Sequence, residues 1–211
     1  TVARSNSNFN LNLKNFKSLS KFFLKNRFKV VINCAAIIDI NYCEKKFSEA
    51  LIINCKLVKF LSEMSKKFDF KFVQISTDHV YKGKRSKLNH EKSQIFAINK
   101  YAKTKILAEK YLSRLKKFLI IRANFTGKKK NTYIDWLVKS IKAKKTINLF
   151  NDMYTSTMDV NTCAEIIIDL ALLKSKGIYN LGSRNMISKK NFAIRLSKNL
   201  KIQIKYKSVS C

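Results

Sequence analysis

Three residues in the middle of the chain, Thr77, Tyr101 and Lys105, have side chains that could act on a carbonyl oxygen. Tyr101 and Lys105 are four residues apart in a segment with helical spacing, so they share one helix face. A neighbouring ammonium favours the ionised form of a phenol and so lowers its pKa. Thr77 follows the short apolar run 72–75, which is typical of a buried parallel strand that ends at a cleft. These residue types could reduce a carbonyl or oxidise an alcohol.

The spacing of Tyr101 and Lys105 is weak support by itself, because the chain is rich in lysine. Tyr42 is also followed four residues later by a lysine, Lys46. The difference is the polar strand end at 76–78, which precedes Tyr101 and has no counterpart before Tyr42. Without that strand end, an exposed tyrosine and lysine on a solvated helix would be the simpler interpretation.

Residues 76–83 read Ser-Thr-Asp-His-Val-Tyr-Lys-Gly and resemble the STDYVFDG motif of the dTDP-4-dehydrorhamnose reductases, members of the extended short-chain dehydrogenase/reductase superfamily. Further segments resemble the same family in the same order: 30–36, 119–124, 152–157 and 177–182. The resemblance implies an α/β fold with a doubly wound, Rossmann-type parallel sheet and a small discontinuous substrate lobe. It also implies NAD(P)H-dependent reduction of a 4-keto nucleotide sugar.

The resemblance assigns three catalytic roles. Tyr101 would protonate the developing alkoxide as general acid. Lys105 would lower the pKa of Tyr101 and hold the nicotinamide ribose. Thr77 would hydrogen-bond the carbonyl oxygen, with Ser76 as the neighbouring alternative.

Other residues are expected to bind the cofactor, NADP or NAD, or the substrate. The expected cofactor contacts are Cys34, Ala35, Ala36, Asn54, Ser76, Tyr101 and Lys105. The expected substrate contacts are Thr77, Asp78, Asn124, Asp152, Thr155 and Ser156. Two of these have a simpler structural interpretation: the turn 34–36 could be small only for tight packing, and Asn54 could be an exposed helix position or could tie its helix to the active-site strand. Arg122 is either a substrate contact or a partner in a structural ion pair.

Hydrophobic periodicity predicts the elements that position these residues. Strands are expected at 29–33, 72–75, 119–123, 147–150, 177–181 and 202–206. Helices are expected at 16–23, 48–66, 99–114, 131–144, 160–173 and 188–200. Ser188 is expected to cap the last of these helices.

Two domains are expected. Residues 1–127 would form the NAD(P)-binding Rossmann-type domain, and 177–182 would return to its sheet. Residues 128–176 and 183–211 would form part of a substrate-binding lobe.

The four glycines, at positions 83, 127, 177 and 182, do not form the Gly-x-x-Gly-x-x-Gly turn that holds a cofactor pyrophosphate at a helix N-terminus. A strand–turn–helix unit of that kind takes about 30 residues. We therefore expect a fragment that begins near the end of the family's second strand, without the first βα unit. The alternative is a homologue that has lost cofactor binding.

Lysine and arginine total 44 against 13 acidic residues, a net charge of +31. The lysines are scattered through every expected helix and loop, which indicates compositional bias rather than a selected nucleic-acid surface. The positive field would still attract an anionic diphosphate. One loop, 79–98, is either solvated or faces substrate phosphates, and its cations are Lys82, Lys84, Arg85, Lys87 and Lys92.

Five cysteines without a Cys-x-x-Cys motif, and only two histidines, indicate neither a disulfide scaffold nor a metal site. No run of 18 apolar residues predicts a membrane span. We therefore expect a cytoplasmic protein with a nucleotide-sugar substrate, no nucleic-acid partner and no membrane association. The resemblance also allows a homodimer.

Three other functions stay open. An epimerase or dehydratase of the same superfamily would need extra acid/base carboxylates at the site, and Asp78 is the only nearby candidate. A non-catalytic regulatory homologue would not bind dinucleotide. A basic nucleic-acid-binding protein would show salt-dependent binding.

Overall fold

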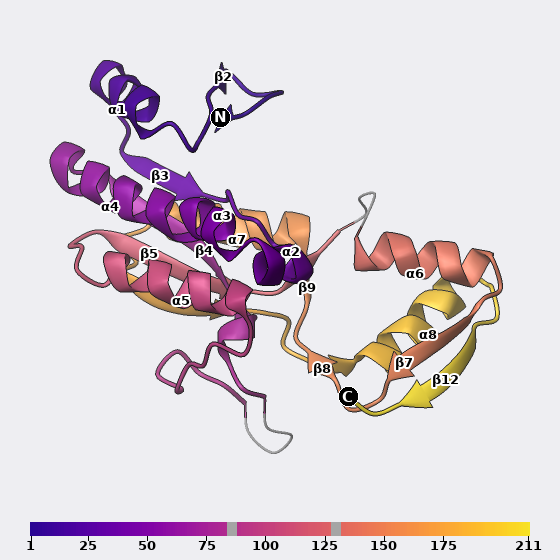
Figure 1. Ribbon diagram of the computed structural model, residues 1–211. Coiled ribbons are helices and arrows are strands. Elements are labelled where there is room, and N and C mark those ends of the chain that lie inside the picture. The colour runs from indigo at the N-terminus through magenta and orange to yellow at the C-terminus, as the bar shows by residue number, and fades with distance from the viewer. Residues whose placement is uncertain (84–87, 128–131) are drawn as a thin grey trace. The chain divides into compact units, whose positions relative to one another are not determined.

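The computed structural model describes residues 1–83, 88–127 and 132–211 and divides into two compact units (Figure 1). Unit 1 comprises Thr1–Arg122 and Ile167–Asn180, and unit 2 comprises Ala123–Ile166 and Leu181–Cys211. Both units are therefore discontinuous in sequence, as the resemblance implies.

The observed division differs from the predicted domain boundaries mainly at one helix, and also at residues 123–127 and 181–182, which belong to unit 2. The prediction assigns residues 167–176 to the substrate lobe, whereas the structure groups them with unit 1. They include the second half of α7 (Val160–Leu172). The Lys71 ammonium explains part of this grouping, because it donates to the carbonyl oxygens of Leu170 and Leu173 at 2.7 Å each.

A four-stranded parallel sheet forms the centre of unit 1, in the order β10-β5-β4-β3. Its strands are β3 (Val30–Asn33), β4 (Lys71–Thr77), β5 (Phe118–Ala123) and β10 (Gly177–Leu181). All six residues of β5 are buried, as expected for a strand covered on both faces of a parallel sheet. The predicted α/β fold is confirmed.

Three helices pack in a row against one face of this sheet: α1 (Phe16–Lys25), α4 (Leu57–Phe68) and α5 (Lys100–Leu112). Their shared core is apolar and rich in phenylalanine, with Phe23 stacked 5.5 Å from Phe70. The helix predicted at 16–23 is confirmed by α1, which buries Leu19 and Phe23. The hydrophobic effect of this burial holds α5 against the strands that carry the candidate site.

The helix predicted at 48–66 is interrupted. It consists of α3 (Phe47–Leu51), the π-helical turn η1 (Ile52–Lys56) and α4. A π-helical turn inserts an extra residue, and such turns occur frequently at functional sites. Here the turn contains Asn54, whose side chain is completely buried. A further short helix, α2 (Ile40–Lys45), occupies a segment where the sequence suggested only a loop.

The segment between β4 and α5 begins with a short 3-10 turn, η2 (Asp78–Val80). Tyr81 and Ile95 then form an isolated antiparallel bridge. Of the cations expected in this loop, Lys84, Arg85 and Lys87 lie outside the described residues. At the start of the chain, β1 (Val2–Ala3) and β2 (Phe9–Asn10) form a small parallel pair.

Unit 2 is built on a second parallel pair, β7 (Thr146–Phe150) and β12 (Lys205–Val209), covered by α6 (Tyr133–Lys142) and α8 (Lys189–Asn199). Two short pairs complete it: β6 (Phe125–Thr126) with β9 (Met158–Asp159), and β8 (Tyr154–Thr155) with β11 (Ile187–Ser188). Ser188 accepts a hydrogen bond from the backbone nitrogen of Asn191 at 3.1 Å, which confirms the predicted helix cap.

The last predicted strand, at 202–206, is displaced toward the C-terminus. Lys201 has a positive φ of 54°, and the strand begins only at Lys205. Ile202 and Ile204 pack instead against the core of unit 2. Their alternation therefore reflects burial beside α8 rather than membership of the sheet.

No helix in the described part of the chain is long and apolar enough to cross a membrane. Over the same residues, no cluster of three or more histidine, cysteine or acidic side chains could hold a metal ion.

Candidate active site

The two hydroxyls predicted to meet at the site do so in unit 1. Tyr101 lies in the first turn of α5, and Thr77 ends β4. The Tyr101 phenol and the Thr77 hydroxyl lie close enough together for Thr77 to lower the pKa of the phenol. Asn99 caps the start of α5 by accepting from the backbone nitrogen of Ala102 at 2.7 Å, which fixes the helix end that carries Tyr101.

Thr77 is held in place by the turn that follows it. Its hydroxyl oxygen accepts from the backbone nitrogen of His79 at 3.2 Å and lies 3.5 Å from a carboxylate oxygen of Asp78. The Thr77 side chain is 5% exposed, so little of it is open to water. These contacts fix the orientation of the hydroxyl at the strand end.

The Tyr101 ring is largely buried against Cys43, Ala50 and Ile37, and His79 lies at its edge. Burial is the largest influence on Tyr101 and raises its pKa. The neighbouring Thr77 hydroxyl lowers the pKa, and the negative charge of Asp78 raises it further. The prediction that Lys105 lowers the pKa of Tyr101 is therefore not supported by the geometry. The reason is that the ammonium of Lys105 is directed at a backbone carbonyl.

Lys105 is one helical turn beyond Tyr101 and is almost completely buried. Its ammonium donates to the carbonyl oxygen of Ile75 at 2.6 Å. Burial lowers the pKa of Lys105 from an ordinary 10.5 to about 8, while the charges of Glu109 and Cys34 act in the opposite direction. The lysine can thus exchange its proton near neutral pH.

Ser76 points away from the hydroxyl pair. Successive side chains of a strand point to opposite faces, so Ser76 and Thr77 cannot serve the same oxygen. The Ser76 hydroxyl donates to a carboxylate oxygen of Glu109 at 2.6 Å inside the protein. This position contradicts the expectation that Ser76 could replace Thr77 or contact a cofactor.

The contacts of Asn54 also differ from those expected of a cofactor-binding residue. Its amide oxygen accepts from the backbone nitrogen of Ile37 at 2.8 Å, and its amide nitrogen donates to the Ile37 carbonyl at 2.9 Å. The same nitrogen donates to the Thr104 hydroxyl at 3.1 Å. The buried amide therefore joins the segment after β3 to α5, which is the supporting role considered above, and leaves no polar group for a ligand.

The turn after β3 has the small side chains that the sequence suggested. Cys34 is exposed, and Ala35 and Ala36 are partly exposed. The backbone nitrogen of Ala35 donates to the Asn33 side chain at 3.2 Å. Neighbouring protein atoms still partly desolvate the Cys34 thiol and so raise its pKa, and the charge of Lys105 opposes this.

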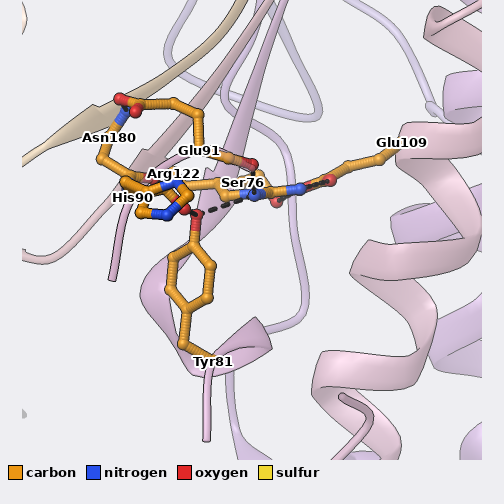
Figure 2. A network of polar contacts seen from close by, with 7 residues as sticks. All are labelled: Ser76, Tyr81, His90, Glu91, Glu109, Arg122 and Asn180. Atoms are coloured by element: carbon orange, nitrogen blue, oxygen red, sulfur yellow. Dashed lines mark hydrogen bonds and ion pairs between the residues drawn. The ribbon is translucent and has the colours of Figure 1, made fainter. Parts of the chain in front are cut away.

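Arg122 belongs to a buried polar network rather than to an open site, as Figure 2 shows. Its guanidinium contacts both carboxylate oxygens of Glu109, through Nη2 at 2.6 Å and Nε at 3.2 Å. Its Nη1 donates to the Tyr81 hydroxyl at 2.7 Å. Burial alone would lower the pKa of Arg122, but the hydrogen bond and charge of Glu109 raise it. The structural ion pair is therefore the correct interpretation of Arg122.

The network continues into β10. The Tyr81 hydroxyl donates to the side-chain oxygen of Asn180 at 2.8 Å, and the backbone nitrogen of Asn180 donates to the Glu91 carboxylate at 2.8 Å. This last hydrogen bond lowers the pKa of Glu91. The network thus connects the segment after β4 to β10, the edge strand that is two positions from β4 in the sheet (Figure 2).

Sequence reasoning missed Glu109. It lies on the same helix face as Tyr101 and Lys105, at a second four-residue interval, and it is 5% exposed. An arginine inside the apolar strand 118–123 required a buried anion, and Glu109 is the carboxylate on the buried face of the preceding helix. That combination could have identified the pair.

Two predicted substrate residues line a small cavity within unit 2. Its volume is about 100 Å³, and its lining residues are Asn124, Phe125, Thr126, Tyr133, Thr155, Thr157, Lys189 and Phe192. The Thr157 hydroxyl links Asn124 and Thr155, at 3.1 Å from each side-chain oxygen. The Lys189 ammonium lies 4.6 Å from the centre of the Tyr133 ring. The cavity therefore combines amide, hydroxyl, cationic and aromatic groups.

The other two predicted substrate residues of unit 2, Asp152 and Ser156, are not among the residues that line this cavity. Asp152 accepts from the backbone nitrogen of Cys211 at 3.0 Å. The backbone oxygen of Ser156 accepts from the backbone nitrogen of Ser183 at 2.9 Å. Both contacts connect the loop 151–157 to other parts of unit 2.

Comparisons with known proteins agree with this fold. The family described as the RmlD substrate binding domain matches residues 1–210. The spore coat polysaccharide biosynthesis protein SpsK of Bacillus subtilis is 27% identical over 186 residues, which cover 87% of this chain and 65% of that protein. The dTDP-4-dehydrorhamnose reductase of Salmonella typhimurium is 27% identical over 174 residues, which cover 79% of this chain and 58% of that protein. The chain thus spans about three fifths of the length of these curated relatives.

Solved structures show the same arrangement of elements. The crystal structure of a hypothetical dTDP-4-dehydrorhamnose reductase from Sulfolobus tokodaii has a TM-score of 0.89 at 28% identity and covers 99% of this chain and 76% of that one. A dTDP-4-dehydrorhamnose reductase from Bacillus anthracis, solved in complex with NADP, also has a TM-score of 0.89, at 24% identity, and covers 95% of this chain and 72% of that one.

Proposed function

Because the chain belongs to the RmlD substrate binding domain family, we propose that it carries the catalytic residues of an NAD(P)H-dependent reductase of a 4-keto nucleotide sugar. The proximity of the Tyr101 phenol at the start of α5 to the Thr77 hydroxyl at the end of β4 is the observation that carries this proposal. Two curated relatives are named dTDP-4-dehydrorhamnose reductase, which supports the substrate class.

In this proposal Tyr101 is the general acid. Burial raises the pKa of its phenol, so the proton is present at neutral pH and can be given to the developing alkoxide. Thr77 donates a hydrogen bond to the same oxygen and stabilises the charge that develops there. The turn of η2 keeps the threonine oriented, so little reorganisation is needed during the reaction.

The residues around Lys105 fit a nicotinamide cofactor, NADP or NAD. The turn 34–36 offers small, exposed or partly exposed side chains that let a ligand approach the backbone. Cys34 also lies close enough to Lys105 for each to affect the pKa of the other. When bound, the nicotinamide supplies the hydride for the carbonyl carbon. The Lys105 ammonium would hold the ribose hydroxyls and place a positive charge beside the reacting groups.

The cavity of unit 2 is the proposed contact for the nucleotide part of the substrate. Asn124 and Thr155 line it and offer hydrogen bonds, while Lys189 and Tyr133 offer a cation and an aromatic face. Asp152 and Ser156 are proposed only to shape the loop beside the cavity, since the contacts described for them run to the protein backbone.

A superfamily epimerase or dehydratase is the second candidate, and one observation favours it. The Asp78 charge acts on Tyr101, so a carboxylate lies close to the proposed acid. Such an enzyme would convert the substrate without net consumption of NADPH or NADH.

The test is the oxidation of NADPH or NADH with a dTDP-4-keto-6-deoxyhexose by the chain extended at its N-terminus with a strand and a glycine-rich turn that can hold the cofactor pyrophosphate, followed by nicotinamide absorbance and product analysis. A reductase consumes one reduced cofactor per reduced sugar, and Tyr101→Phe abolishes this reaction. Product formed without cofactor consumption would select the epimerase or dehydratase. Neither dinucleotide binding nor conversion would reject both and leave the regulatory homologue.

A further inference from the structure

Glu109 is a buried carboxylate that the proposed chemistry does not use. It accepts three hydrogen bonds, one from the Ser76 hydroxyl and two from the Arg122 guanidinium. The exposed fraction of its side chain is 6%, and that of Arg122 is 3%. A carboxylate with this many charge-assisted donors is held in one orientation.

The position of Glu109 matches two rows of residues, one on α5 and one on β4. Tyr101, Lys105 and Glu109 follow one another at four-residue intervals on α5. Three consecutive residues of β4 face them. Lys105 contacts Ile75, Glu109 contacts Ser76, and Tyr101 lies beside Thr77. Glu109 therefore adds a third attachment to the same helix face and the same strand end as the two proposed catalytic residues on α5.

Glu109 also supplies the negative charge opposite Lys105. The ammonium of Lys105 is buried, and burial of a cation is unfavourable without a compensating charge. Glu109 on α5 and Cys34 from the turn after β3 both favour the charged lysine, and Glu109 is the larger influence. Two other ionisable groups interact with different residues. Arg122 of β5 pairs with Glu109, and Asp78 after β4 raises the pKa of Tyr101.

We propose that Glu109 is a positioning residue of the proposed reductase, which keeps Lys105 cationic and holds α5 against β4 so that Lys105 and Tyr101 stay beside Ile75 and Thr77. Ser76 and Arg122 act through it by fixing its carboxylate. The inference rests on the proposed function, because it assigns Glu109 to the same reaction.

A purely structural ion pair is the competing explanation, and it makes a different prediction. Replacing a buried pair by neutral groups of similar volume is often neutral or stabilising, whereas removing one partner is strongly destabilising. Glu109→Gln alone would leave Arg122 unpaired and could prevent folding. The double variant Glu109→Gln/Arg122→Gln removes both charges and keeps hydrogen-bonding side chains in place.

The experiment is an NMR titration of the Lys105 side chain in the full chain labelled with ¹³C-lysine, with the signal assigned by its loss in Lys105→Met. The double variant is expected to lower the Lys105 titration midpoint, because Glu109 acts on Lys105 directly whereas Arg122 acts on Glu109. Ser76→Ala is expected to leave the midpoint near that of the unmodified chain, because the carboxylate remains.

Glu91→Gln is the matched control. Glu91 is a second carboxylate of the same network, and its side chain contacts the backbone of Asn180 instead of Arg122. Its removal is expected to leave the Lys105 midpoint unchanged. An unchanged midpoint in the folded double variant, or an equal shift in Glu91→Gln, would overturn the proposal.

Turnover provides the second readout. The alkaline limb of the kcat/KM profile is expected to move to lower pH in the double variant by the same amount as the Lys105 midpoint. A shifted midpoint with an unmoved alkaline limb would overturn the role in the reaction. Absence of turnover in the chain extended with the glycine-rich βα unit rejects the proposed function itself, and the NMR titration distinguishes that failure because it requires neither substrate nor cofactor.

Discussion

The Lys105 ammonium donates to the backbone carbonyl of Ile75 at 2.6 Å, two residues before Thr77 at the end of the strand. The helix that carries the proposed acid is thus attached to the strand that carries its hydroxyl partner. This attachment orders the proposed site even without a ligand, and its removal or alteration gives measurable consequences.

Tyr101→Phe is expected to lower turnover by roughly 10²–10⁴-fold, because the general acid is lost while the ring and its packing remain. Cofactor affinity should change little, which fluorescence titration with NADPH would measure. Tyr42→Phe is the matched control: it has the same spacing to a lysine, but its hydroxyl contacts Glu49 at the surface. Full turnover in Tyr101→Phe would exclude Tyr101 as the acid.

Substitutions at the two neighbouring hydroxyls should separate chemistry from stability. Thr77→Val is expected to reduce kcat, and Thr77→Ser to restore most of it. Ser76→Ala removes a hydrogen bond to a buried carboxylate and should lower the free energy of unfolding by about 1.5–3 kcal/mol. Steady-state kinetics and chemical denaturation measure the two effects; loss of kcat in a stable Ser76→Ala protein would contradict this division.

Lys105 should make the stability of the protein depend on pH. Its folded pKa of about 8 lies below its ordinary value of 10.5, so the unfolded chain binds more protons between these limits. Stability from this group therefore rises with pH across that window, by about 3 kcal/mol in total, and the penalty is fully present below pH 8. Urea unfolding at several pH values should show the rise relative to Lys105→Met. Parallel curves of unfolding free energy against pH for the unmodified protein and Lys105→Met would refute this pH dependence.

Asn54→Ala should destabilise the protein, because it leaves the backbone nitrogen and carbonyl of Ile37 without their partner. The expected loss is about 2–4 kcal/mol in the free energy of unfolding, measured by denaturation. A double-mutant cycle with Thr104→Val isolates the contact between these two side chains. A loss within experimental error would show that the π-helical turn does not depend on this amide.

Lys189→Gln should raise KM for the nucleotide sugar and leave cofactor affinity unchanged, because Lys189 lines the cavity of unit 2. Lys190→Gln is the control, since the neighbouring ammonium lies 5.6 Å from the Tyr206 ring instead. Steady-state kinetics with varied substrate would compare the two variants. Equal effects in both would indicate only a general loss of positive charge.

The sheet of unit 1 was predictable because its strands are short runs rich in apolar residues. β5 is the clearest example, with all six residues buried. The helix predicted at 160–173 likewise agrees with α7 within one residue at its end. Continuous burial gives a strong pattern in the sequence, whereas the predicted strand at 202–206 followed alternating isoleucines that pack beside a helix.

The polar core was less predictable, because hydrogen-bond partners are distant in sequence. Asn54 and Thr104 are 50 residues apart, and Ser76 and Glu109 are 33 apart. Periodicity shows that a residue lies on a buried face but does not identify its partner across the fold. For this reason the expected cofactor contacts Ser76 and Asn54 proved to be buried within the protein, and Glu109 was overlooked.

The contact between Tyr81 and Asn180 joins residues 99 positions apart, and β10 supplies it. A ribosome delivers the chain from its N-terminus at about 5–20 residues per second, so this interval lasts on the order of 5–20 s. β5, the strand next to β10 in the sheet, is synthesised within this interval and ends at Ala123, 54 residues before β10 begins. Completion of unit 1 is therefore paced by translation, and the nascent chain exposes an unfinished sheet until residue 181 has emerged.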